Sequence, residues 1–210
     1  MVPWKGFADP HANPVSSDAQ ALAFQYIANN SDYYLARGHM VAKADFVWAQ
    51  QQRATFYYIN AAPQWQTFNG GNWERLESSV RRLAATRERD LLVITGAWGR
   101  ARLPHASGKP ADLFVNAQGL IPVPALYWKV VFDSSTGEGA AFVGVNNPYT
   151  TLAGEPRLAL CKDVCASIDW VSWAPDSVKA GEGYCCEVDA LRAAIPDVPQ
   201  LKVSALLAKA

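Results

Sequence analysis

Four cysteines, clustered in the last quarter of the 210-residue chain, constrain its folding more than any other feature: Cys161, Cys165, Cys185 and Cys186. An even number of cysteines in a local cluster favours two disulfides. A bond between the neighbours Cys185 and Cys186 would strain the peptide, so each is expected to pair with Cys161 or Cys165. A zinc site is the alternative, but adjacent cysteines fit the usual spacing of zinc ligands poorly. We therefore expect a disulfide-stapled C-terminal region.

Disulfides are typical of an oxidising compartment. The triplet Asn29-Asn30-Ser31, an acceptor for N-glycosylation, weakly favours the same compartment. The chain has no apolar run long enough to cross a membrane, and no secretory leader follows Met1. We expect a secreted protein with no membrane partner, whose leader has been removed from this sequence.

Strands and helices are expected to mix without a regular βαβ alternation, which predicts an α+β fold rather than a doubly wound sheet. Runs rich in aromatic and β-branched residues predict strands at 54–60, 91–96, 126–132 and 140–145. Apolar residues at helical spacing predict a helix over 72–87 with Asn72 as its N-cap, and shorter helices are expected at 18–28 and 186–194. A loop through Pro63 and Gly70-Gly71 is expected between the first strand and the long helix. No repeat or linker is seen, so residues 1–210 are expected to form one domain with a loop-rich start at 1–30.

The charge balance is neutral, with 19 basic and 19 acidic residues, which is not the signature of a strongly basic nucleic-acid binder. The distribution is uneven, because residues 71–110 hold eight basic and four acidic residues, whereas 111–210 hold seven and eleven. Such a local excess can steer a polyanion towards one face. A solvated helix surface is the alternative interpretation.

Two polar segments, 34–40 and 60–77, together offer the groups that phosphodiester hydrolysis requires. The imidazole of His39 can take a proton from water near neutral pH. Arginines can stabilise the charge that builds up on phosphorus, and oxygen ligands suit a hard divalent cation. The arginines are Arg37 and Arg81, and the oxygen ligands are Asn69 and Glu77. Gly38 is expected to let the backbone turn sharply and expose the imidazole.

Each of these residues also has an ordinary structural interpretation. Glu77 and Arg81 are four residues apart and would pass as a helix salt bridge. The asparagines can be caps or turn residues. His11 and His105 lie in proline-rich loops without such neighbours. Trp73 falls on the apolar face of the expected helix, whereas Trp65 in the expected loop can either pack in the core or stack on a base.

The order of the groups resembles the DNA/RNA non-specific endonuclease family. The resemblance rests on residues 36–44 (ARGHMVAKA), Thr55-Phe56, residues 60–64 (NAAPQ), Asn69, Trp73 and Leu76-Glu77. It is dense over 34–96 and looser over 126–145. It implies a ββα-metal fold, in which two strands and a helix support a histidine base and one metal ion, with a mixed or antiparallel central sheet flanked by helices.

The resemblance also implies a role for each residue of the motif. His39 would be the general base, Arg37 and Arg81 would contact the phosphates, and Asn60 would organise the site and bind substrate. Asn69 would bind Mg²⁺ directly, with Mn²⁺ as a substitute, and Glu77 would hold the waters around the ion. The expected activity is cleavage of double-stranded RNA or DNA with little sequence specificity, leaving 5′-phosphate ends.

Two features depart from the usual family pattern. Ala36 stands where the motif usually begins with aspartate, a substitution that also occurs in an arthropod secreted subgroup of double-strand nucleases, which residues 63–66 (PQWQ) resemble too. No arginine precedes Arg37, so Lys5, another part of the chain or a missing N-terminal segment would replace an upstream phosphate contact. Two alternatives stay open: an inactive nucleic-acid-binding protein with the same fold, and a Cys–His hydrolase built from the cysteines and His105.

Overall fold

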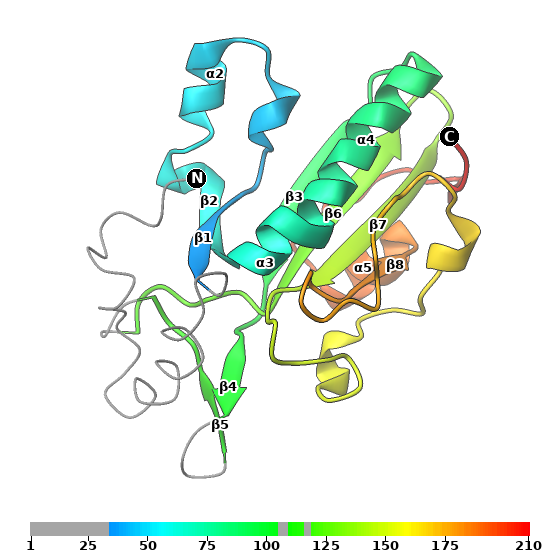
Figure 1. The fold of residues 1–210 in the computed structure, drawn as a ribbon. Coiled ribbons are helices and arrows are strands. Elements are labelled where there is room, and N and C mark those ends of the chain that lie inside the picture. Colours follow the sequence, from blue (N-terminus) through cyan, green and yellow to red (C-terminus); the bar gives the residue numbers. More distant parts are fainter. Residues whose placement is uncertain (1–33, 105–108, 116–118) are drawn as a thin grey trace.

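The computed structural model describes residues 34–104, 109–115 and 119–210 (Figure 1). Its centre is an antiparallel sheet, which confirms the three strands expected at 91–96, 126–132 and 140–145. The order is β3 (Leu92–Trp98), β6 (Leu126–Asp133), β7 (Glu138–Val145) and β8 (Gly183–Cys186), and the short strand β9 (Ala205–Leu206) pairs parallel to β7. Strands and helices do not alternate regularly, so the α+β class is confirmed.

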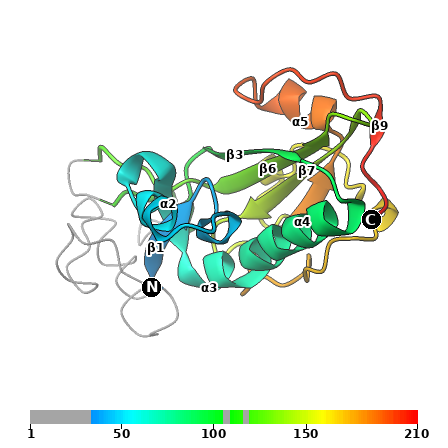
Figure 2. The ribbon, with the colours of Figure 1, turned by 90° about the horizontal axis from the view of Figure 1, so that it is seen from above.

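A helix covers each face of this sheet (Figure 2). Side chains of β6 alternate between the two faces: Tyr127 and Val131 pack in the cluster that contains Leu76, Val80 and Leu83 of α4 (Glu74–Arg87). Leu126 and Val130 pack on the opposite side, in the cluster that contains Leu191 of α5 (Val188–Ala194). Every residue of β6 is therefore buried. Strands of antiparallel sheets commonly expose one face to solvent, but both faces of β6 are covered.

A second, two-stranded sheet lies beside the central one and leads into α4 (Figure 1). Strand β1 (Leu35–His39) pairs antiparallel with β2 (Ala61–Trp65), with His39 opposite Ala61. Strand β2 continues through α3 (Gln66–Phe68) and a π-helical turn (Asn69–Trp73) into α4. The described chain thus contains the two strands and helix that a ββα site requires.

Buried polar contacts attach this hairpin to the central sheet. Asn146, just after β7, accepts a hydrogen bond from the Trp65 backbone at 2.8 Å and donates to the Pro63 carbonyl at 3.0 Å. The Tyr127 hydroxyl donates to the same carbonyl at 3.3 Å. Because all these groups are buried, each needs its partner in the folded protein.

The strand expected at 54–60 is wrong. Residues 40–60, which we call the β1–β2 connection, carry instead the helix α2 (Ala49–Ala54) and short 3₁₀ turns at Lys43–Asp45 and Tyr58–Asn60. The strand lies at Ala61–Trp65, where a loop was expected. Aromatic and β-branched residues in the connection imitate a strand, whereas the true strand is short, contains Pro63 and belongs to a two-stranded hairpin that tolerates proline.

Asn72 is not an N-cap. Gly71 breaks the helical path, with φ −105° and ψ −117°, and the buried Asn72 side chain bonds across to the C-terminal segment. Its amide donates to the carbonyls of Ala174 at 2.7 Å and Gly181 at 2.6 Å, and its oxygen accepts from the Ala174 backbone at 2.8 Å. These bonds fix the start of α4 against residues far along the chain.

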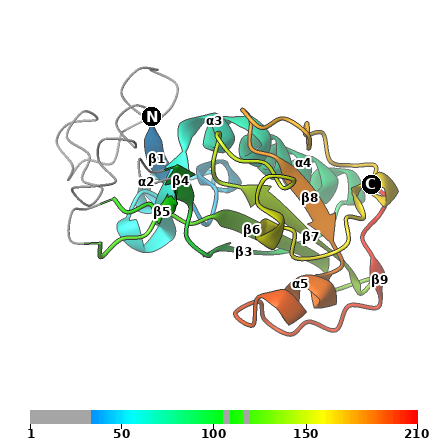
Figure 3. The same cartoon turned by 90° about the horizontal axis from the view of Figure 1, so that it is seen from below.

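The C-terminal region is held by two disulfides, as expected. Cys161 is bonded to Cys186 and Cys165 to Cys185, which selects one of the two pairings left open and rules out the zinc site. Asp163 stabilises the region around the disulfides by accepting hydrogen bonds from the backbone of Cys165 and Cys185. Figure 3 shows β8 and α5 of this region from below.

Smaller elements complete the described chain: β4 (Arg102–Pro104) pairs with β5 (Pro110–Asp112), and 3₁₀ turns lie at Pro156–Leu158 and Cys165–Ser167. No helix among the described residues is long and apolar enough to span a bilayer. The helix expected at 18–28, the triplet at 29–31, Lys5, His11 and His105 lie outside the described residues.

Candidate active site

His39 is the last residue of β1, where the strand leaves the hairpin for the connection. Gly38 before it does not make the expected sharp turn but lies within a regular strand. A Cβ atom at this position would lie 2.3 Å from Gln64 Oε1 and 2.6 Å from the Tyr127 hydroxyl. Gly38 is therefore required because the backbone of β1 passes close to buried neighbours.

The surroundings of His39 favour its neutral form. Burial lowers the pKa of the imidazole below 6.5, and the positive charges of Lys43 and Arg37 lower it further. The Phe56 ring packs edge-on against the imidazole, with centroids 4.6 Å apart. The Nε2 atom is buried and has no hydrogen-bond partner in the part of the chain that the structure describes. A neutral imidazole is the form that can take a proton from water.

Arg37 lies on β1 two residues before His39 and contacts the connection. Its Nη1 donates to the Phe56 carbonyl at 3.4 Å, and its guanidinium lies 5.1 Å from the centroid of the Tyr58 ring. The planar guanidinium is thus placed by a carbonyl and a stacked ring, as arginines at anion-binding sites commonly are.

Asn60 holds the connection together. Its side chain bonds the backbone of Val41 twice, accepting from N and donating to O at 3.0 Å each, and donates to the Thr55 carbonyl at 3.0 Å. This geometry supports the organising role expected of Asn60. Its contact with substrate stays a prediction.

Glu77 lies in the first turn of α4 and is half-buried. Burial raises the pKa of its carboxyl to about 7, and the positive charge of Lys129 is the largest effect in the opposite direction. Lys129 lies in the centre of β6, 2 % exposed, with its Nζ 2.6 Å from Thr95 Oγ1 and 5.0 Å from the Trp73 ring. Lys129 is thus a buried basic group whose charge acts on the carboxyl of Glu77.

Sequence reasoning missed Lys129. The signal was present, because Lys129 is the one charged residue inside the apolar run 126–132, where a lysine must have a partner to be buried. Burial lowers the pKa of Lys129, and the charge of Glu77 opposes that change.

Arg81, one turn after Glu77, forms its ion pair with Asp45 of the connection at 3.0 Å. The helix salt bridge with Glu77 that its spacing allowed is replaced by this contact, and a second bond joins Arg81 to Ser78 at 2.9 Å. Asp45 was not singled out in the sequence, because nothing in its spacing relates it to the helix. The pair fastens the connection to α4 and places Arg81 beside it.

Asn69 begins the π-helical turn before α4, and its amide nitrogen donates to Gln66 Oε1 at 3.4 Å. An amide oxygen and a carboxylate are ligands that suit a hard divalent cation. The raised pKa of Glu77 fits such an ion, because a nearby cation would stabilise the charged carboxylate. Another group of candidate metal ligands among the described residues, Asp163 with Cys165 and Cys185, contains two disulfide sulfurs and is unsuited to binding.

Trp65 and Trp73 are both fully buried, so neither can stack on a base. The expected core position of Trp73 is confirmed. Of the two roles left open for Trp65, packing in the core is the one that the structure shows. The disulfides likewise dispose of a cysteine nucleophile, because none of the four sulfurs is a free thiol.

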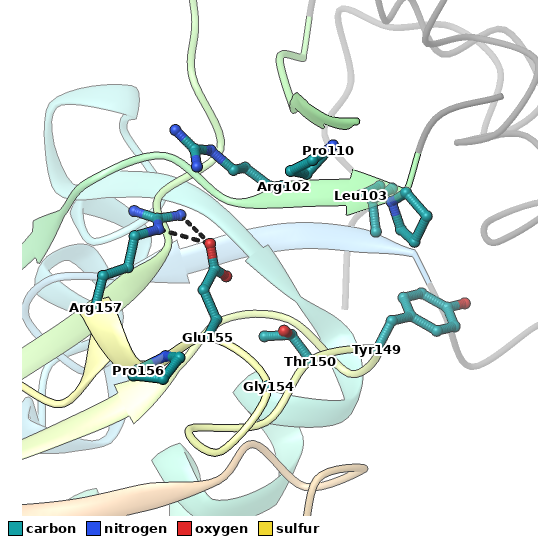
Figure 4. A pocket seen from close by; sticks show the side chains of 10 residues that line it. Arg102, Leu103, Pro110, Tyr149, Thr150, Gly154, Glu155, Pro156 and Arg157 are labelled. Atoms are coloured by element: carbon teal, nitrogen blue, oxygen red, sulfur yellow. Dashed lines mark hydrogen bonds and ion pairs between the residues drawn. The ribbon is translucent and has the colours of Figure 1, made fainter. Parts of the chain in front are cut away.

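A cavity of about 570 Å³ lies between β4 and the segment 149–157 (Figure 4). None of the predicted site residues lines it. Charges on its wall are paired: Arg157 with Glu155 at 2.6 Å, and Arg102 with Asp112 at 3.0 Å. We therefore place the chemistry at the hairpin and α4 rather than in this cavity.

Comparisons with known proteins identify a family and several relatives. The family model described as DNA/RNA non-specific endonuclease matches residues 8–191. The salivary endonuclease of Lutzomyia longipalpis is 38% identical over 162 residues, 74% of this chain and 37% of that protein. Salivary protein Tsal1 of Glossina morsitans morsitans is 25% identical over 80% of this chain and 41% of its own length. The nuclease of Serratia marcescens is 28% identical over 63% of this chain and 46% of its own.

The chain thus spans less than half of the length of these three relatives. Among solved structures, a chain of the EndoG/EndoGI complex matches with a TM-score of 0.47 and 24% identity, over 81% of this chain and 60% of that one.

Proposed function

The chain belongs to the DNA/RNA non-specific endonuclease family, and we propose that it hydrolyses phosphodiester bonds in double-stranded RNA or DNA with little sequence specificity. The observation that carries the proposal is a neutral, partly buried His39 beside Arg37 on β1, within the residues that the family model matches. The groups assigned to the reaction address phosphate, and none is expected to read a base edge, which accounts for low sequence specificity.

In the proposed reaction His39 takes a proton from a water, and that water attacks the phosphorus in line with the departing 3′ oxygen. The bond from phosphorus to the 3′ oxygen breaks, the departing oxygen takes a proton from a second water to become a 3′-hydroxyl, and the other product carries a 5′-phosphate. Arg37 and Arg81 bind the scissile phosphate and its neighbour, where their charges stabilise the transition state. Asp45 holds Arg81 in the free protein, so phosphate competes with an exposed carboxylate that is weakly paired.

Mg²⁺, or Mn²⁺ in its place, is the proposed cofactor, with Asn69 as a direct ligand and Glu77 orienting the hydration shell. When bound, the ion would neutralise charge that develops on the phosphate. The buried carboxyl of Glu77 supports this assignment, because its charged form has no ion pair within the described chain. The positive charge of Lys129 offsets part of the cost of charging this carboxyl.

Secretion and the preference for duplexes are proposed on narrower grounds. Salivary proteins are among the relatives, and the two disulfides suit an oxidising compartment. Ala36 and the residues 63–66 resemble the arthropod subgroup that attacks double-stranded substrates. These properties are those of whole proteins, and this chain spans only part of the length of its relatives.

The alternative is a protein that binds nucleic acid without cutting it. Its support is Ala36, which is fully buried opposite Gln64 and supplies no carboxylate where the family usually has one. Digestion of plasmid DNA, single-stranded DNA and double-stranded RNA with Mg²⁺ separates the two, using wild type and His39→Ala with and without EDTA. A nuclease of the proposed kind cuts when the wild-type protein is tested with Mg²⁺, and it does not cut in EDTA or as His39→Ala. Equal cutting by His39→Ala would refute the mechanism.

A further inference from the structure

Large apolar side chains are exposed mainly in one segment of the described chain. Eight such side chains are exposed, and six of them belong to the β1–β2 connection: Val41, Val47, Trp48, Tyr57, Tyr58 and Ile59. Ile59 is 95% exposed and Val47 86%. Single exposed apolar residues are ordinary, but a concentration within one short segment indicates a surface that contacts another molecule.

The connection is held in place by many contacts. Asn60 bonds both Val41 and Thr55, and Gln52 Nε2 donates to the Phe46 carbonyl at 2.8 Å. The ion pair between Asp45 and Arg81 joins the segment to α4. The aromatic residues are therefore presented by a fastened segment, as a binding surface requires.

This surface is continuous with the candidate active site. Tyr58 lies against the Arg37 guanidinium, Phe56 lies against His39, and Ile59 directly precedes Asn60. A substrate whose phosphate reaches Arg37 and His39 therefore has its next sugar or base within the region of these side chains.

The charges of the connection favour an anionic occupant. Lys43 and Arg53 are its basic residues, and its one acidic residue, Asp45, is paired with Arg81. Arg37 adds a further positive charge at the edge. Tyrosine, tryptophan and basic residues together are typical of surfaces that hold nucleic acid, where rings contact sugars and bases.

Resting on the proposed function, we infer that the β1–β2 connection is the surface that holds a nucleic-acid duplex beyond the scissile phosphate. Trp48, Tyr57 and Ile59 contact its sugars and base edges, and Lys43 and Arg53 contact its phosphates. Rings and aliphatic side chains make such contacts without regard to sequence, as in proteins that insert apolar side chains into the minor groove.

The two kinds of contact differ in their dependence on salt. A phosphate contact releases counterions, so each lost contact reduces the slope of log K against log salt concentration by about 0.9. Apolar contacts release none. Loss of the apolar residues is therefore expected to lower affinity at every salt concentration and to leave the slope unchanged.

The test measures binding of a short fluorescent duplex, RNA or DNA, by anisotropy, in the His39→Ala background so that the duplex stays intact. The variant Trp48→Ser/Tyr57→Ser/Ile59→Ser is expected to bind at least tenfold more weakly with an unchanged salt slope. Arg53→Ala is expected to reduce the slope by about 0.9. Leu92→Ser, which changes an exposed apolar residue on β3, is the matched control and should bind normally.

Thermal melting checks that each variant is folded, and Ile59→Glu serves as a second variant if the triple one is not. Unchanged affinity of a folded variant would overturn the inference. The inference would also be overturned if the triple variant bound duplex normally but sedimented as a monomer where the unsubstituted surface gave a dimer. That result would make the surface a contact between two copies of the chain. Cutting by the wild type is measured separately, so failure of the proposed function and failure of this inference give different results.

Discussion

Replacing Glu77 by glutamine is expected to stabilise the metal-free protein at high pH while damaging its activity. The carboxyl has a pKa of about 7 in the fold, against 4.5 for the ordinary group, because burial disfavours its charged form. As pH rises from about 4.5 to 7, the unfolded chain loses this proton before the folded one does. The free energy of unfolding therefore falls over this range and then levels off.

The magnitude follows from the pKa difference. At about 1.4 kcal/mol per pH unit, the change from 4.5 to about 7 corresponds to at most about 3.5 kcal/mol. Solvent reaches part of the carboxyl, and Lys129 loses a neighbouring negative charge in the variant. We therefore expect glutamine to gain about 2 kcal/mol at pH 8 relative to pH 4.5.

Urea unfolding in EDTA at pH 4.5 and pH 8, followed by tryptophan fluorescence, measures the gain. Other titrating groups are common to both proteins and cancel in the difference between them. Glu74→Gln, which changes an exposed carboxyl on the same turn of α4, is the control and should show a much smaller gain, because the charge of Glu74 is the last of the causes that raise the pKa of Glu77. If Glu77→Gln gains nothing between the two pH values, the carboxyl is not the buried, disfavoured charge described above.

Further predictions concern the reaction and the crosslinks. His39→Ala should lower kcat by about 10²- to 10⁴-fold, the usual contribution of a general base, and a loss below tenfold in plasmid nicking would contradict that role. Asn69→Ala should lose cutting that added Mg²⁺ restores only in part, so a Mg²⁺ titration identical to wild type would remove Asn69 as a ligand. Arg37→Ala should bind duplex with a salt slope smaller by about 0.9, which anisotropy at several salt concentrations tests. Removing both disulfides by Cys→Ala should cost about 3 kcal/mol in urea unfolding, whereas removing the Cys161–Cys186 bond alone should cost less, because Cys165–Cys185 still closes nearly the same loop. Equal costs would contradict this reasoning.

The sequence predicted the elements with a regular apolar pattern and misplaced β2, a short strand that contains Pro63 although its second half is buried. The central strands and α4 bury regular apolar patterns, and the two disulfides follow from cysteine spacing and strain. The run 54–60 was misread because composition predicts a strand without saying whether its side chains will be covered. The position of the strand is decided by the pairing of β1 with Ala61–Trp65. This pairing joins residues far apart in the sequence, so local composition does not predict it.

The candidate site shows the same division. The positions of His39 and Arg37 follow from the motif, because neighbours on a short strand cannot lie far apart. Lys129 and Asp45 come from other elements, β6 and the connection, and reach Glu77 and Arg81 only in the folded chain. Local spacing therefore predicts candidate residues for the reaction, whereas the charges around them depend on tertiary structure.

Asn146 has a consequence for the interpretation of natural variants. The hairpin with His39 and the central sheet are separate ladders in the described chain, and this one buried amide bonds Trp65, Pro63 and Pro124 across the junction. A displacement of about 1 Å at reacting groups can cost about 10²-fold in rate. Because Asn146 is buried, a substitution there would be interpreted as a change in protein stability. We expect it also to lower the rate of cleavage, because it would shift His39, which Asn146 does not contact.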